Sequence, residues 1–161
     1  DGMKVSFGFM LCVFVFLSGT LVAQNAATNT RPEGMDGLMA LSEKSTVRIG
    51  EALEQIALLA GSEPRDAQAA LSFLAGKGIV STDIALDAVL TRGCLAAMIM
   101  KIKGWGGGVM YSLFGGGRYA WRELVYRNVM QAGGSEHSPV SGGELLAVIG
   151  RAAGDVELKM E

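Results

Sequence analysis

The sequence predicts an all-α fold of about five helices in two to two and a half helix–loop–helix repeats, behind an N-terminal signal helix. Apolar residues recur at helical spacing in five segments, and glycines follow the segment ends. Residues 66–104 also align on residues 116–154 without a gap, which is typical of a repeat. Half of the 161 residues are apolar and 19% are charged, as in chains that fold around a core, and the net charge of −2 argues against nucleic-acid binding.

The N-terminal residues 1–23 predict a signal peptide. Lys4 precedes an apolar run over residues 5–17, and small or aliphatic residues lead up to Ala23, after which we expect cleavage. An uncleaved membrane anchor is the alternative, because about 20 apolar residues suffice to span a bilayer. Residues 24–44 are small and polar, and they predict a flexible tether.

A helical repeat domain is expected over residues 45–154, followed by a charged tail over residues 155–161. The first two helices are expected over residues 46–60 and 62–76, with Ser62 as the N-cap of the second. Their core-facing positions follow the helical period. These positions are Ile49, Leu53, Ile56, Ala57, Ala60, Ala67, Ala70, Leu71 and Leu74.

Three further helices are expected, over residues 91–104, 118–128 and 141–154. Thr91 is a favourable N-cap for the first of them, and Ser141 and Glu144 have the spacing of a capping box at the start of the last. The glycine-rich segment 104–117 lacks the strand and the Lys-Ser/Thr pair of a phosphate loop. We therefore interpret it as a hinge between repeats.

The repeat itself resembles the S-layer homology (SLH) repeat. Residues 65–80 predict a helix that ends in glycine and aliphatics, and a loop then leads to Thr91-Arg92, where the family has a Thr-Arg-Ala-Glu motif. Tyr119-Ala120-Trp121 stands where the family often has a Trp-Ala pair. The resemblance covers about residues 45–154 and implies a fold of stacked helix–loop–helix units.

The resemblance also implies a role for Arg92, because the arginine of the SLH motif helps to bind anionic cell-wall polysaccharide. Two positions of the motif differ from the family pattern. Cys94 stands where glutamate is expected in the first unit, and Gly142 stands where arginine is expected in the second.

No catalytic or metal-binding set is predicted. Cys94 is the one cysteine left after removal of the signal, and His137 is the one histidine; in a repeat fold they fall in different units. One cysteine and one histidine are too few to build a metal site, so we expect neither a metal nor a cofactor. Cys94 is expected to be a small residue near the core, with thiol catalysis as a distant alternative.

Aromatic and basic residues gather in one stretch of the domain. Six of the seven aromatic residues after residue 23 are interleaved there with Arg118, Arg122 and Arg127. The six are Trp105, Tyr111, Phe114, Tyr119, Trp121 and Tyr126. Such residues can bind a glycan or a protein partner. The alternative places Tyr119, Trp121 and Tyr126 in the core, and leaves Trp105 and Tyr111 as the exposed pair.

These observations predict a non-catalytic, exported module of the cell envelope or periplasm that serves as a protein-interaction or assembly scaffold. The alternative is a module that binds cell-wall polysaccharide or peptidoglycan. The candidate ligand-binding residues for a glycan or a partner are Arg92, Trp105, Tyr111, Arg118 and Arg122. No nucleic-acid partner is expected, and a membrane contact only through an uncleaved N-terminal segment.

Overall fold

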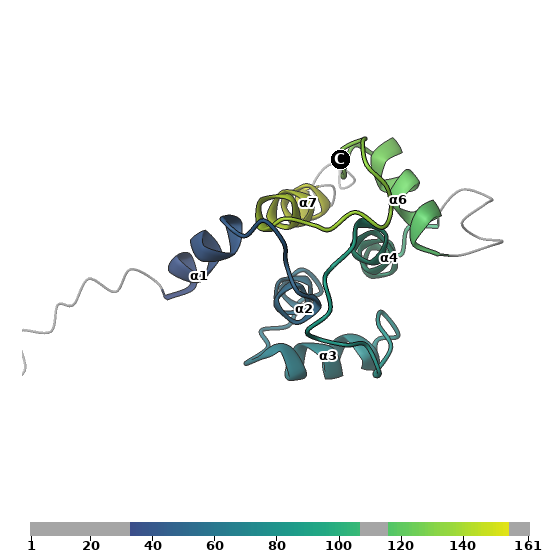
Figure 1. Cartoon of the computed structure of the whole chain (residues 1–161). Helices are drawn as coiled ribbons and strands as arrows, with labels where there is room; N and C mark the ends of the chain where they lie inside the picture. The colour runs from purple at the N-terminus through teal and green to yellow at the C-terminus, as the bar shows by residue number, and fades with distance from the viewer. Residues whose placement is uncertain (1–32, 107–115, 155–161) are drawn as a thin grey trace, which may run out of the picture. The chain divides into compact units, whose positions relative to one another are not determined.

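The computed structural model of the chain describes residues 33–106 and 116–154. These residues form six α-helices and no strand, which confirms the predicted all-α class (Figure 1). The helices are α1 (Glu33–Ser42), α2 (Ile49–Leu59), α3 (Ala67–Gly76), α4 (Arg92–Lys103), α6 (Gly117–Tyr126) and α7 (Gly142–Gly154). The chain divides into two units, Asp1–Asp36 and Gly37–Glu161, and every contact named below lies within the second. The predicted signal peptide, Tyr111 and the charged tail lie outside the described residues.

A closed ring of three backbone hydrogen bonds lies at the centre of the second unit. The N–H of Val47 donates to the carbonyl of Val140, that of Leu90 to Val47, and that of Val140 to Leu90, at 2.9, 2.9 and 3.0 Å. All three side chains are fully buried. The ring therefore joins three distant chain segments inside one core.

Each residue of the ring precedes a helix by the same distance. Helices α2, α4 and α7 begin two residues after Val47, Leu90 and Val140, respectively. Figure 1 shows these three helices nearly end-on around the centre of the unit. The ring register thus makes α2 the counterpart of α4 and α7, in agreement with a truncated unit that precedes the two complete ones.

The 50-residue repeat is present in the structure. Helix α6 begins and ends 50 residues after α3, and α7 begins 50 residues after α4. Equivalent positions are buried in both copies, as the pairs Ala70 and Ala120, Leu74 and Leu124, Leu90 and Val140, and Leu95 and Leu145 show. Each copy is a helix, a loop and a second helix, as the sequence predicts.

Successive units are joined where a loop docks on the start of a helix. The N–H of Gly50 at the start of α2 donates to Leu86, and the N–H of Gly93 at the start of α4 donates to Glu136, 50 residues further on, both at 2.8 Å. At the start of α7, the N–H of Gly142 donates to Lys44 at 2.9 Å. Side chains at the starts of α2, α4 and α7 therefore lie at the contacts between units.

The boundaries of two segments differ from the expectation. Helix α3 begins at Ala67 rather than after Ser62, because the Asp66 carboxylate accepts the N–H of Ala69 at 2.8 Å and caps the helix there. Residues 33–42, which their composition assigned to the tether, form α1, and Leu41 is buried. The ordered part of the chain therefore begins before residue 45.

Candidate functional site

Arg92 is the first residue of α4 and forms the most extensive polar contact between units. Its Nε lies 2.7 Å from Oε1 of Glu144 and its Nη2 lies 3.1 Å from Oε2, so that two parallel hydrogen bonds join α4 to α7. Its Nη1 donates to the carbonyl of Gly133. The two side chains are only 19% and 18% exposed. The charge of Arg92 is thus compensated within the protein.

The N-terminal caps of α4 and α7 are confirmed. Thr91 Oγ1 accepts the N–H of Cys94 at 3.4 Å, and Ser141 Oγ accepts the N–H of Glu144 at 3.2 Å. The capping-box spacing predicts that the Glu144 carboxylate accepts a backbone N–H at the start of its own helix. In the structure this carboxylate binds Arg92 instead. The residue that the sequence assigned to a local cap therefore serves a contact between units.

At the joint between α2 and α4, the corresponding positions are apolar. The ring register places Ile49 where Arg92 stands and Cys94 where Glu144 stands. Ile49 is buried, and Cys94 is a half-buried free cysteine that packs against the core. Burial raises the pKa of the Cys94 thiol, so the thiol is protonated at neutral pH. The prediction of a small residue near the core agrees with this position.

At the third joint, glycine takes the place of the arginine. A Cβ on Gly142 would collide with the backbone carbonyl of Leu41 at the end of α1, so no side chain fits there. Glu51, which corresponds to Glu144, instead binds the Lys44 ammonium and accepts the N–H of Arg48 at 3.1 Å. The hydrogen bond from Lys44 is the main cause that lowers the pKa of Glu51.

Trp105 follows the C-terminal end of α4 and is half-buried against the core. The Arg127 guanidinium lies 5.0 Å from its ring centre and the Lys103 ammonium 5.7 Å, which is the range of cation–π contacts. The 12 residues of α4 separate it from Arg92 by roughly 18 Å. The expectation of a freely exposed Trp105 is wrong, and Trp105 does not share a site with Arg92.

Helix α6 carries an exposed face of a different character. Arg118, Arg122 and Tyr126 are spaced by four residues, so they follow one another along one side of the helix, and we name them the α6 face. All three are exposed, and Tyr126 retains 84% of its surface. The alternative that placed Tyr126 in the core is therefore wrong.

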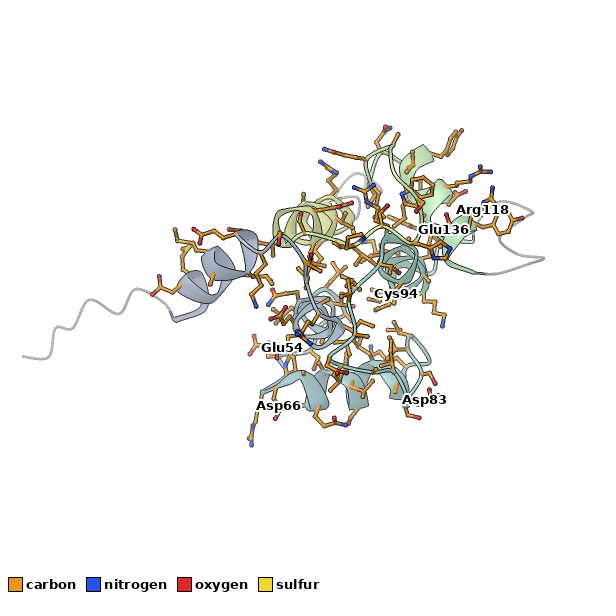
Figure 2. The ribbon with its side chains drawn as sticks, viewed as in Figure 1. Glu54, Asp66, Asp83, Cys94, Arg118 and Glu136 are labelled. Carbon is orange, nitrogen blue, oxygen red and sulfur yellow. The ribbon has the colours of Figure 1, made fainter. Side chains whose placement is uncertain are left out.

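The two arginines of the α6 face have no side-chain hydrogen bond or ion pair to the described part of the chain. The nearest acidic residue on the helix, Glu123, is engaged by Arg127 at 2.9 Å. Figure 2 shows Arg118 at the outer edge of the unit, next to α6. The α6 face therefore presents two arginines that form no ion pair with the described residues, beside an exposed aromatic ring.

The structure divides the predicted ligand-binding residues into three groups. Arg92 is paired between units, Trp105 is packed at the far end of α4, and Arg118 and Arg122 share the α6 face. Sequence reasoning missed Glu144 as the partner of Arg92 and Tyr126 as an exposed residue. The shared register of Glu51 and Glu144 does not give this partner, because Glu51 binds Lys44 instead.

Residues 33–106 and 116–154 contain no group of three or more His, Cys, Asp or Glu side chains that could hold a metal ion. The same residues contain no helix of the length and apolarity needed to cross a bilayer. No family model matches the chain, and neither the curated proteins nor the solved structures include a match to it.

Proposed function

We propose that the chain is a non-catalytic interaction module of the cell envelope, and that the α6 face is its contact surface for a protein partner. The observation that carries this proposal is the pair of exposed arginines, Arg118 and Arg122, which have no ion-pair partner in the described part of the chain and stand beside the 84% exposed Tyr126. Arginine and tyrosine are enriched in protein interfaces and among the residues that dominate binding energy.

The chemistry of Cys94 supports a non-catalytic role. A cysteine nucleophile needs a lowered pKa and a base within hydrogen-bond reach. Burial instead raises the pKa of Cys94, and its N-cap contact is the hydroxyl of Thr91. His137, the one histidine, is 86% exposed and lies 3.6 Å from Glu136.

The geometry of Arg92 favours a protein partner over a wall polysaccharide. The polysaccharide alternative requires the Arg92 guanidinium to be available to an anionic ligand. Glu144 and the carbonyl of Gly133 already occupy its donors, and both ion-pair side chains are largely buried. Placement in the envelope rests on the predicted signal peptide in residues 1–23.

Site-specific photocross-linking in the native host tests the proposal. The photoreactive aromatic amino acid p-benzoylphenylalanine replaces Tyr126, and in a matched control it replaces Ala147, which is exposed on α7. We expect a defined protein adduct from position 126 and none from position 147. Adducts of equal yield at both positions, or only glycan adducts at position 126, would overturn the proposal.

A further inference from the structure

Charge is distributed unevenly along the second unit. Residues 43–90, which hold α2 and α3, contain seven acidic and four basic side chains, a net charge of −3. Residues 91–154, which hold α4, α6 and α7, contain seven basic and three acidic side chains, a net charge of +4. The total charge of the chain, −2, conceals this polarity.

The α6 face lies on the opposite side of the unit from the carboxylates of α2 and α3. Figure 2 shows Glu54, Asp66 and Asp83 along the side formed by α2 and α3, and Arg118 on the far side, at α6. Helix α3 packs on α2 and α6 packs on α4, so the central helices separate α3 from α6. We name the acidic side by Glu54, Asp66 and Asp83 together with Glu63, which lies in the connection between α2 and α3.

The repeat shows that the basic α6 face does not follow from the backbone. Arg118 and Arg122 of α6 correspond to the uncharged Gln68 and Ser72 of α3. Asp87, in the loop before α4, corresponds to His137, in the loop before α7. Both copies hold four basic and three acidic side chains, so the α6 face reflects where the charges stand and not a higher net charge of its copy.

Charges on both sides are available to a partner. Arg118 and Arg122 have no partner in the described part of the chain, and neither do the carboxylates of Glu54 and Glu63. Since both sets of charges are near the surface, their attraction to an opposite charge depends on ionic strength. Complementary patches of this kind steer association and select the partner.

We propose that the partner of the α6 face is a second copy of this chain, which docks its acidic side on the α6 face. This inference rests on the proposed function and names its partner. The contact joins two different surfaces, so each copy in a pair keeps one free α6 face and one free acidic side. Repetition of such a head-to-tail contact gives rings when the rotation closes and open chains when it does not.

Sedimentation of the chain purified from the cell envelope tests the inference, with two charge-reversal variants. The first is Arg118→Glu/Arg122→Glu on the α6 face, and the second is Glu54→Lys/Glu63→Lys on the acidic side. We expect concentration-dependent association of the native chain at low salt, and its loss at high salt. Each variant alone should associate about tenfold or more weakly, because like charges then meet.

An equimolar mixture of the two variants supplies the decisive readout. Association should return in the mixture, because each contact again joins opposite charges, and this recovery also shows that both variants fold. A native chain that stays monomeric at low salt, or association that neither reversal weakens, would overturn the inference. If the chain is monomeric but position 126 still gives an adduct with another protein, the inference is wrong and the proposed function stands. If the chain is monomeric and position 126 gives no protein adduct, both the inference and the proposed function are wrong.

Discussion

Arg92 and Glu144 join the starts of α4 and α7 through two parallel hydrogen bonds of 2.7 and 3.1 Å. The pair lies across a joint between repeat units, and its two equivalents in the ring register are Ile49 with Cys94 and Gly142 with Glu51. Three joints of similar backbone geometry thus carry an ion pair, an apolar pair and a glycine. We therefore propose that Arg92 stabilises the joint between α4 and α7.

Removal of the Arg92 side chain should destabilise the domain. Arg92→Ala leaves Glu144 half-buried without its charged partner, and we expect a loss of about 1–3 kcal/mol in the free energy of unfolding. Urea denaturation followed by circular dichroism measures it. The matched control is Arg122→Ala, which removes an exposed and unpaired guanidinium and should change the free energy by less than about 0.5 kcal/mol. Equal effects of the two substitutions would contradict this assignment.

Gly142 should not tolerate even a methyl group. Its Cβ would meet the carbonyl of Leu41, so Gly142→Ala must displace the end of α1 and should cost about 1–3 kcal/mol. The adjacent Gly143 has only the Ser42 carbonyl at 3.7 Å from a Cβ. Gly143→Ala should therefore be neutral or stabilise α7 by up to about 1 kcal/mol. Thermal unfolding of both variants distinguishes the two sites, and a stable Gly142→Ala protein would refute the close contact.

Glu51 should contribute stability that depends on pH. The hydrogen bond from Lys44 lowers its pKa in the folded state. The contribution is therefore present above the pKa of the unfolded chain, near 4.5, and is lost as the pH falls through the lower folded-state pKa. Glu51→Gln should destabilise the domain at pH 7 and have little effect at pH 3. Urea denaturation at the two pH values measures the difference, and an equal loss at pH 7 and pH 3 would contradict the role of the Lys44 hydrogen bond.

Cys94 should react slowly with alkylating reagents. Because burial raises its pKa, the thiolate that attacks iodoacetamide is scarce at pH 7.5 in the folded domain. Mass spectrometry of the peptide that contains Cys94 should show labelling about tenfold or more slower than in urea. Labelling at equal rates in the folded and unfolded states would indicate an accessible thiolate and revive the catalytic alternative.

Local signals in the sequence predicted most of the helices. Thr91, Gly104 and Ser141 act at the ends of their own helices, and the structure places each helix end where they indicated. The predicted start of α3 is wrong because Ser62 and Asp66 are both favourable N-cap residues. Only Asp66 accepts the N–H of the residue three positions later, Ala69. Cap chemistry alone does not choose between two such residues.

The contacts between units could not be predicted in the same way. The partner of Arg92 is 52 residues away, and the spacing of Ser141 and Glu144 favoured a local use of the same carboxylate. Trp105 is in contact with Arg127, the residue that follows the C-terminal end of α6. Such contacts depend on how the units dock, which a repeat pattern predicts in outline and not residue by residue.

Binding of purified variants to isolated native envelope tests the central claim, that the α6 face and not the Arg92 pair is the binding surface. The assay compares Arg118→Glu/Arg122→Glu with Arg92→Ala at a temperature at which circular dichroism shows both to be folded. We predict that the α6 variant is lost from the envelope fraction and that Arg92→Ala is retained. The account would be contradicted if the α6 variant still bound the envelope and Arg92→Ala no longer bound purified wall polysaccharide.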